Sequence, residues 1–385
     1  MELMPGCKHS DVGVIPDDWD AKPLGEIGDS LIGLTYRPSE VRKYGTLVLR
    51  SSNVQNGTLL FDDNVFVETD IPERIMVRPG DILVCVRNGS RDLIGKSALI
   101  DERAIGMTFG AFMAVFRSEH GKLLHHVFQS GIFKKQINEH LGATINQITN
   151  KSLNSFKVPL PPTDEERTEI ANALSDVDAL LATLDQVIAK KRDLKQAAMQ
   201  QLLTGETNLP GLSGDWDVKR LGQVLTICHG KSQRDVEVID GTYPILATGG
   251  QIGTALRPLY DKPSVLIGRK GTINQPQYMD EPFWTVDTLF YSVIKDENSA
   301  KFLYYRFCLI DWMQYNEASG VPSLNARTIE SIEIACPEPA EQAAIADVLS
   351  DMDAELIALE SRRDKTRNIK QAMMQELLTG KTRLV

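Results

Sequence analysis

The sequence of 385 residues has little of what a secreted, metal-held or membrane-spanning protein needs. Its five cysteines, Cys7, Cys85, Cys228, Cys308 and Cys336, stand singly with no CxxC spacing, so neither a disulfide framework nor a zinc site is indicated. No run of 18 apolar residues occurs, so no membrane span is predicted. The first residues, MELMPGCKHSD, lack the apolar core of a signal peptide. We therefore expect a cytoplasmic protein with no bound metal.

Motifs that mark catalytic sites are missing as well. Three Gly-Lys-Ser/Thr triplets begin at Gly95, Gly230 and Gly380, but each lacks the glycine five residues upstream that a phosphate-binding loop requires. The motifs GxGxxG, HExxH and GxSxG do not occur, nor does the Asn/Asp-Pro-Pro-aromatic motif expected of a DNA methyltransferase. The six histidines, including the pair His125-His126, show no metal-ligand spacing. The sequence therefore predicts no catalytic residue and no cofactor site in this chain.

A segment that occurs twice organises the rest of the chain. Residues 170–205 and 345–380 align without a gap at an offset of 175 positions, and about 20 of the 36 aligned positions are identical. Upstream, DWDAKPLG at 18–25 and DWDVKRLG at 215–222 repeat at an offset of 197, so the first globular part is 22 residues longer than the second. The duplication therefore covers the whole chain: a globular module followed by a helix, twice.

Apolar residues in the repeated segments follow the four-and-three spacing of a coiled-coil seam. Thr163 with Glu166 predicts a capping box at the first helix start, and Pro339 suits the first turn of the second helix. Gly205 and Gly380 predict left-handed caps at the two ends. Such helices of roughly 40 residues would be about 60 Å long. The predicted seam residues are Ile170, Leu174, Val177, Leu181, Leu184, Ile188, Ile345, Leu349, Met352, Leu356 and Leu359.

Charge along the two helices predicts how they pair. Residues 164–185 are almost wholly acidic and residues 190–195 are basic, and the second copy repeats this with 341–360 and 362–370. Two such helices attract each other when antiparallel and repel when parallel. The same polarity also complements the helix dipole, which is a simpler explanation for it. Because the seam still needs a partner, an antiparallel pair within the chain is the preferred interpretation.

Between the helices, short apolar runs separated by turn residues predict small mixed modules. Each module ends with a helical segment, 120–141 in the first and 300 to about 315 in the second, followed by a polar turn at 142–144 or 319–323. We predict an α+β protein in which two similar small α/β modules are separated by two long helices that pack as an antiparallel coiled coil, with a pseudo-two-fold internal repeat. The predicted segments are residues 1–161 (first module), 162–208 (first spacer helix), 209–337 (second module) and 338–385 (second spacer helix). The predicted strands are 47–49, 64–67, 81–86, 98–100 and 111–116 in the first module and 243–246, 264–267 and 288–294 in the second.

One loop in each module carries side chains that suit nucleic acid. Residues 87–91 follow the strand 81–86, and residues 269–275 follow the strand 264–267. Arg, Lys, Asn and Gln side chains suit both phosphates and base edges, and the glycines allow close backbone approach. Either loop alone could be an ordinary solvated loop, but matching loops in matching places favour DNA. The candidate DNA-binding residues are Arg87, Asn88, Ser90, Arg91, Lys96, Thr248, Arg269, Lys270, Thr272, Asn274 and Gln275.

The negative net charge is only a weak argument against DNA binding. The chain carries −10 overall, but binding depends on a local basic face rather than on the total. Segments 163–205 and 338–380 hold about −3 and about −4 of this charge, so a basic face on the modules is compatible with the composition.

This organisation resembles the specificity (S) subunits of type I restriction-modification enzymes, over essentially the whole chain. The resemblance rests on the order of motifs rather than on one of them. The motifs are the two DWDxKxLG segments, RPGDILVCVRNGS, KPSVLIGRKGTINQP, GATINQITNKSLNSFKVPLPP, SGVPSLNARTIESIEIACPEP and the repeated helix ending KQAAMQQLLTG or KQAMMQELLTG. It implies two target recognition domains that each read one half of a bipartite site in double-stranded DNA. It further implies two modification (methyltransferase) subunits and restriction subunits as partners, with S-adenosylmethionine, ATP and Mg²⁺ bound by those partners, and a non-catalytic role for this chain.

Two alternatives stay open at this point. The chain could be the specificity subunit of a related system in which the methyltransferase and nuclease are fused. It could also be a coiled-coil scaffold that does not bind DNA and uses both helices to bring partner proteins together. The scaffold predicts no salt-dependent affinity for DNA, whereas the recognition subunit predicts one.

Overall fold

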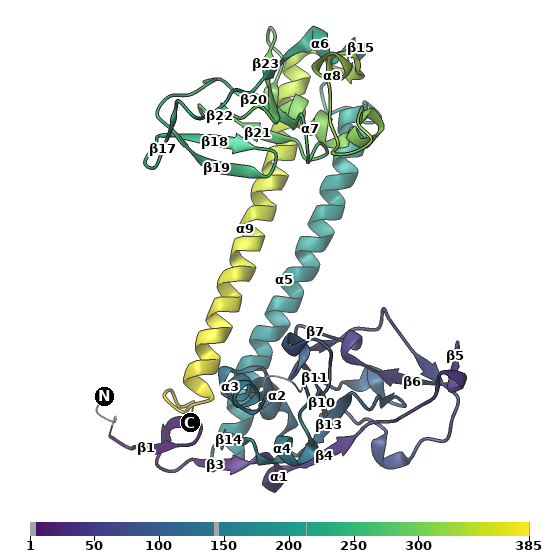
Figure 1. Cartoon of the computed structure of the whole chain (residues 1–385), viewed down its shortest axis with the longest axis vertical. Helices are drawn as coiled ribbons and strands as arrows, with labels where there is room; N and C mark the ends of the chain where they lie inside the picture. The colour runs from purple at the N-terminus through teal and green to yellow at the C-terminus, as the bar shows by residue number, and fades with distance from the viewer. Residues whose placement is uncertain (1–4, 142–145, 213, 385) are drawn as a thin grey trace. The chain divides into compact units, whose positions relative to one another are not determined.

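The computed structural model describes residues 5–141, 146–212 and 214–384, and the chain divides into two compact units (Figure 1). Unit 1 comprises Met1–Thr183 together with Arg363–Val385, and unit 2 comprises Leu184–Arg362. Both boundaries fall inside the long helices, so each unit contains one globular module and a segment of each helix. The predicted division into four consecutive segments is therefore a different partition of the chain, and it stays a prediction.

The module of unit 1 is built from short strands in small sheets with three further helices beside α1. Two four-stranded sheets form its centre, in the orders β11-β10-β13-β4 and β12-β6-β9-β5, with β12 and β6 parallel and the other pairs antiparallel. The strands are β1 Cys7–Ser10, β2 Gly13–Pro16, β3 Asp20–Pro23, β4 Asp29–Ile32, β5 Val41–Arg42, β6 Thr46–Leu49, β7 Val54–Gln55, β8 Thr58–Leu59, β9 Phe66–Val67, β10 Ile82–Cys85, β11 Ser97–Leu99, β12 Thr108–Phe109, β13 Met113–Arg117 and β14 Lys157–Leu160. The helices are α1 Leu24–Ile27, α2 Gly121–Gln129, α3 Gly131–His140 and α4 Asn150–Ser155.

The module of unit 2 repeats this plan with fewer strands. Its four-stranded sheets have the orders β16-β23-β20-β21 and β17-β19-β18-β22, again with one parallel pair, β18 with β22. The strands are β15 Asp217–Arg220, β16 Leu225–His229, β17 Glu237–Val238, β18 Tyr243–Ala247, β19 Gly250–Ala255, β20 Ser264–Gly268, β21 Gln277–Met279, β22 Trp284–Thr285, β23 Leu289–Ile294 and β24 Glu333–Cys336. The helices are α6 Leu221–Val224, α7 Ala300–Leu309 and α8 Ala326–Ser331.

The two four-stranded sheets of one module are equivalent, strand by strand, to those of the other. The parallel pair places Phe109 opposite Leu49 in unit 1 and Thr285 opposite Leu246 in unit 2. Likewise β10 pairs with β13, as β20 pairs with β23. The duplication that the sequence shows in the helices and the DWD motifs therefore extends through the modules, although their sequences differ.

The long helices are α5, Asp164–Thr204, and α9, Pro339–Leu377. At the start of α5 the Thr163 hydroxyl accepts the backbone N–H of Glu166 at 3.2 Å, but the Glu166 carboxylate binds Arg383, so only half of the predicted capping box forms. Pro339 is the first residue of α9, as predicted. Gly205 and Gly380 have φ of 78° and 68°, the left-handed region that a residue with a Cβ adopts at a cost.

In each unit, α5 (teal) and α9 (yellow) lie side by side and run antiparallel (Figure 1). Unit 1 buries Ile170 and Leu174 of α5 in one core with Leu377, the last residue of α9, and Leu378, which follows it. Unit 2 buries a second core, in which α5 contributes its last turns and α9 its first: Met199, Leu202, Leu203, Ile345 and Leu349. Both cores also contain side chains of the module, so the helix pair and the module of each unit form one hydrophobic core. The predicted α+β fold with an antiparallel helix pair is confirmed within each unit. The predicted internal repeat is confirmed because the two units contain the same arrangement.

In both units, the tryptophan of the DWD motif packs against the glycine at the end of a long helix. In unit 1, Trp19 is 1% exposed and a Cβ on Gly380 would lie 3.2 Å from its ring. In unit 2, a Cβ on Gly205 would lie 3.2 Å from the Trp216 ring. The repeated DW and TG dipeptides, which stand far apart in the sequence, therefore meet in both units.

Several details of the predicted elements are wrong. The predicted helix 120–141 is two helices, α2 and α3, separated at Ser130, and the predicted helix 300–315 ends at Leu309. Strands β4, β16 and β19 and the short helices α4 and α8 were not predicted, because four to six residues of mixed polarity give no periodic signal. The polar turn predicted at Gly142-Ala143-Thr144 lies outside the described residues. Among the residues that are described, no helix combines the length and apolarity that crossing a membrane requires.

Candidate nucleic-acid interface

The loop after β10 in unit 1 is held by two hydrogen bonds to one carbonyl oxygen. The backbone N–H groups of Val86 and Arg87 both donate to Phe112 O, each at 3.1 Å. On the other side, Ile148 N donates to Val86 O at 2.8 Å, and Arg87 forms an isolated bridge with Gln147. The main chain thus fixes where Arg87 leaves the sheet, and its side chain is exposed.

The loop after β20 in unit 2 is held in the same way. The N–H groups of Arg269 and Lys270 donate to Thr288 O at 2.8 and 3.2 Å. Leu324 N donates to Arg269 O at 2.9 Å, and Lys270 forms an isolated bridge with Ser323. By these contacts Lys270 takes the place of Arg87, and Thr288 takes the place of Phe112.

Two glycines lie at an equivalent close approach of two chain segments in the modules. A Cβ on Gly33 would lie 2.3 Å from Gly110 O, and a Cβ on Gly230 would lie 2.0 Å from Val286 O. These distances are too short for any side chain, so both positions require glycine. Gly33 and Gly230 stand 197 positions apart, the offset of the two DWD motifs, so the same chain crossing recurs in both modules.

The other candidates of unit 1 cluster around Ser51. Asn88 Nδ2 donates to Ser51 Oγ at 3.4 Å, and Lys96 Nζ donates to Ser51 O at 3.4 Å. Ser90 is exposed, and its backbone N–H donates to Asn88 Oδ1 at 3.0 Å. The Arg91 guanidinium instead donates to two carbonyls at the end of α3, at 3.4 and 3.3 Å. Hydrogen bonds therefore hold the Arg91 side chain against the protein more firmly than the other candidate side chains of unit 1.

The candidates of unit 2 spread along one continuous loop. Arg269, Lys270, Asn274 and Gln275 are exposed, and Thr272 is half-buried. Thr248 lies beside this loop, since a Cβ on Gly271 would lie 3.6 Å from its hydroxyl. The structure therefore brings Thr248 next to the loop 269–275, as it brings Ser51 next to Asn88.

Each module has a hollow, but only that of unit 2 is lined by its candidate loop. The hollow of unit 1 has a volume of about 590 Å³ and lies between Tyr36, Ser51 and Phe112. The hollow of unit 2 has a volume of about 1000 Å³ and is lined by Arg269 and Lys270 together with residues 317–326. The two modules therefore present different surfaces on equivalent frameworks.

Sequence reasoning missed Phe112. The residue is 60% exposed, and the Arg87 guanidinium carbon lies 5.2 Å from the centroid of its ring. Phe112 precedes β13, where an apolar residue reads as the start of a buried strand, so no sequence signal distinguishes it from core.

Ion pairs join the helices in both units, as the charge pattern predicts. In unit 1, Lys370 Nζ lies 2.6 Å from Asp178 Oδ1. In unit 2, Lys195 pairs with Asp353, and Lys191 Nζ lies 2.8 Å from Glu355. Lys195 and Lys370, like Asp178 and Asp353, are equivalent residues of the repeat, so one ion pair occurs twice.

The predicted seam residues have two environments. Ile170, Leu174, Leu184, Ile188, Ile345, Leu349 and Leu356 are buried, whereas Val177, Leu181, Met352 and Leu359 are half-buried. Of these, only those near the helix starts, together with Met352, belong to the module cores. The seam residues near the helix starts thus pack against the module as well as against the other helix.

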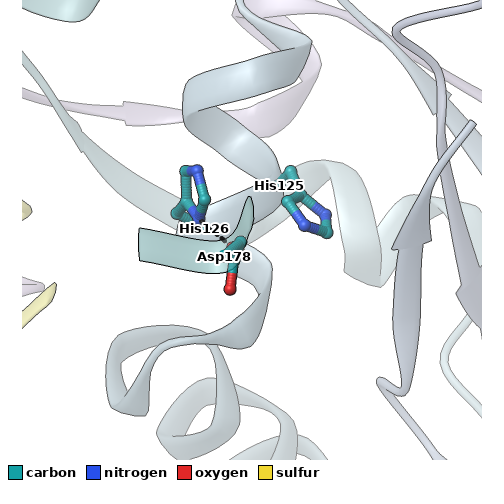
Figure 2. Close-up of side chains that lie close together, drawn as sticks. All are labelled: His125, His126 and Asp178. Atoms are coloured by element: carbon teal, nitrogen blue, oxygen red, sulfur yellow. Dashed lines mark ion pairs between the residues drawn. The ribbon is translucent and has the colours of Figure 1, made fainter. Parts of the chain in front are cut away.

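In each unit, a side chain of the module contacts the aspartate of this repeated ion pair. In unit 2, the Tyr305 hydroxyl of α7 donates to Asp353 Oδ2 at 2.7 Å and lies 3.4 Å from Ser350 Oγ. In unit 1, His126 of α2 takes this place: its Nε2 lies 3.2 Å from Ser175 Oγ and its Nδ1 lies 3.7 Å from Asp178 Oδ2. Figure 2 shows His126 beside Asp178, with His125 leaving α2 in another direction.

Burial lowers the pKa of His125 to about 3 and that of His126 to about 4, and the neighbouring positive charges act in the same direction. Both imidazoles are therefore neutral at neutral pH. With Asp178 they form a group whose possible ligand atoms lie within 4.8 Å of one another. The Lys370 ammonium already neutralises that carboxylate, which disfavours a cation there. The expectation that the chain binds no metal stays a prediction.

The fold and the paired loops define a class of protein with two equivalent modules, each sharing a core with segments of two antiparallel helices. The sequence profile of the family described as "Type I restriction modification DNA specificity domain" matches residues 16–190 and 213–367. The chain therefore belongs to this family, and the resemblance seen in the sequence is confirmed.

Individual relatives agree with the family. The chain is 26% identical over 240 residues to the type I restriction enzyme StySPI specificity subunit of Salmonella potsdam, a match that covers 58% of this chain and 51% of the relative. A match of 26% identity to the putative type I restriction enzyme MjaX specificity subunit of Methanocaldococcus jannaschii covers 98% of this chain and 96% of the relative. The match to the EcoKI specificity subunit of Escherichia coli covers 44% of that protein, so the chain spans about half the length of some relatives.

Solved structures show the same fold. The crystal structure of a type I restriction-modification system S subunit from M. genitalium has a TM-score of 0.67 to this chain at 16% identity, with 98% of both chains covered. A chain from a structural study of complex assembly and conformational transition of the type I R-M system has a TM-score of 0.55 at 18% identity, covering 96% of this chain and 99% of that one.

Proposed function

We propose that this chain is the DNA-recognition subunit of a type I restriction-modification complex, in which each module reads one half of a bipartite site in double-stranded DNA. The observation that carries the proposal is the repeated main-chain platform under Arg87 and Lys270. Two modules that share a framework and differ in the side chains it presents are suited to reading two different short sequences.

The chemistry of the loops suits base edges in the major groove. Arg87, Arg269 and Lys270 can donate to guanine O6 and N7, and Asn88, Asn274 and Gln275 can pair with an adenine edge. The remaining candidates, Ser90, Arg91, Lys96, Thr248 and Thr272, suit phosphate oxygens, which position a protein without specifying sequence.

The helix pair is proposed to hold the partners. Two modification subunits would bind around α5 and α9, and restriction subunits would complete the complex in the cytoplasm. S-adenosylmethionine, ATP and Mg²⁺ would be bound by those partners, and this chain would contribute sequence choice and assembly but no catalytic residue. Its relatives are named specificity subunits, which supports this role.

The test separates the two modules. The site is first found by methylome sequencing of cells with and without this chain. The complex is then prepared with Arg87→Ala in one variant and with Arg269→Ala and Lys270→Ala in another. We expect each lost base contact to weaken binding by about 1–3 kcal/mol and to relax the preference in one half-site only.

The control is built into the design, because each variant leaves the other half-site as an internal reference. Equal loss at both half-sites would indicate general destabilisation rather than base reading. Unchanged site preference in both variants, or no salt-dependent DNA affinity in the wild-type complex, would contradict the proposal and favour the scaffold.

A further inference from the structure

Phe112 is placed on the surface by the main chain. It lies in the turn between β12 and β13, where Met113 N donates to Gly110 O at 2.8 Å. Its own carbonyl accepts the N–H groups of Val86 and Arg87. These bonds fix the main chain at Phe112, while 60% of the residue stays exposed. The exposed ring offers an apolar face to a bound molecule.

The ring stands beside a guanidinium. Arg87 Cζ lies 5.2 Å from the ring centroid, the spacing of a cation–π pair. This pair places an apolar face next to a fork of donors. In the major groove, the fork suits guanine O6 and N7, and an apolar face suits the 5-methyl group of thymine.

The hollow next to the ring provides room for such a group. Leu34, Ala111 and Met113 line it beside Phe112. Arg50 and Asp63, whose Nη2 and Oδ2 atoms lie 2.8 Å apart, also line it. An apolar group that approached the Phe112 ring in this hollow would exchange contact with water for contact with carbon.

The equivalent place in unit 2 lacks both parts of the pair. Thr288 takes the position of Phe112 and Lys270 that of Arg87, as the shared main-chain hydrogen bonds show. A lysine is a point charge without the planar fork, and threonine offers only one methyl group. The aromatic contact therefore belongs to the first module alone.

We propose that Phe112 is a specificity-determining residue of the first module and that it reads the 5-methyl group of one thymine, next to the base pair that Arg87 contacts. The proposal rests on the function proposed above and deepens it. It assigns a chemical group, the methyl carbon that distinguishes thymine from uracil and from unmodified cytosine, to one side chain.

The experiment replaces thymines one at a time by deoxyuridine in the site found by methylome sequencing, and measures the affinity of the assembled complex. Loss of one buried methyl contact predicts roughly four-fold weaker binding for the wild type at a single thymine of the first half-site. Phe112→Ala should bind the thymine and deoxyuridine duplexes equally at that position and keep the wild-type response at every other position. Phe112→Leu, which keeps an apolar surface, should retain most of the discrimination.

Each outcome decides the question. If wild type and Phe112→Ala respond alike to deoxyuridine at every position, or if the first half-site contains no thymine on either strand, the assignment is wrong. It is also wrong if Phe112→Ala lowers recovery of the modification subunits with site preference unchanged, because Phe112 is then a protein contact. A wild-type complex with no preferred site at all would instead refute the proposed function, and Thr288→Ala in the second module serves as the matched control.

Discussion

Replacement of Arg383 by alanine tests how the helix pair is closed in unit 1. The Arg383 guanidinium binds the Glu166 carboxylate, with Nη2 2.8 Å from Oε2, and also contacts Asp18 Oδ1 at 3.1 Å. Glu166 is fully buried and Arg383 stacks on Trp19, 5.7 Å from the ring centroid. One side chain that follows α9 thus ties the first turn of α5 to the DWD motif, and its hydrogen bonds to Glu166 and then Asp18 raise the pKa of Arg383.

The expected cost follows from the carboxylate that is left behind. Removing one partner of a buried ion pair costs about 3–5 kcal/mol when the remaining charge stays buried. The Arg383 side chain is 34% exposed, so water will reach Glu166 in the variant, and we expect a loss of about 1–3 kcal/mol. For a unit of this size, 2 kcal/mol corresponds to roughly 4–8 °C in Tm.

The assay is thermal unfolding of the full chain, monitored by calorimetry. Arg383→Ala should lower the transition of unit 1, and adding Glu166→Gln should restore part of the loss, since a neutral amide costs less to bury than an unpaired carboxylate. A transition unchanged in the single variant, or lowered further in the double variant, would refute the reasoning.

Unit 2 offers the converse experiment. Glu341, the equivalent of Glu166, is 4% exposed, and its Oε1 has no hydrogen-bond partner among the described residues. Asn208 takes the place of Arg383: Thr207 N donates to Gln201 O as Thr382 N donates to Glu376 O. Asn208→Arg should therefore stabilise unit 2 by about 1 kcal/mol, as expected for a partly exposed ion pair, and raise its Tm. An unchanged Tm would mean that the stabilisation by Arg383 depends on features found in unit 1 alone.

Two further predictions concern pH and the glycine at the repeated chain crossing. Because the pKa of buried His125 and His126 lies near 3 and 4 in the fold and near 6.5 when unfolded, the unfolded chain takes up protons first. Unit 1 should thus lose stability as pH falls from about 6.5 to 4, by up to about 1.4 kcal/mol per pH unit for each histidine. Calorimetry at pH 7 and pH 5 checks this, and a His126→Tyr variant that loses as much as the wild type would contradict it. Gly230→Ala places a Cβ 2.0 Å from a backbone oxygen and should destabilise unit 2 by about 1–3 kcal/mol, whereas Gly249→Ala meets nothing within 4 Å and should have little effect on Tm.

The parts of this structure that recur in the sequence were the parts that could be predicted. The repeat at offset 175 gave the two helices, and the alternation of acidic and basic segments gave their antiparallel pairing, because charge and apolar spacing act locally along a helix. The caps at Thr163, Gly205 and Gly380 were predicted for the same reason, since each depends on neighbouring residues.

The candidate interface was predictable only in part. The loops after β10 and β20 were found because arginine and lysine follow directly on apolar strands. Their exact match, Arg87 with Lys270 rather than with Arg269, depends on hydrogen bonds to Phe112 and Thr288, which the sequence does not reveal. The pairing of His126 or Tyr305 with an aspartate of the long helices was equally hidden, because the partners are separated by tens of residues and differ in type.

The way unit 1 is assembled has a consequence for synthesis on the ribosome. Its core contains Trp19 and Ile170 but also Leu377 and Leu378, which are translated after the whole of unit 2. Unit 2 is one uninterrupted stretch, Leu184–Arg362, and can close as soon as that stretch has emerged. The core of unit 1 is therefore complete only when the last turns of α9 have been made, so the module that precedes unit 2 in the chain is completed after it.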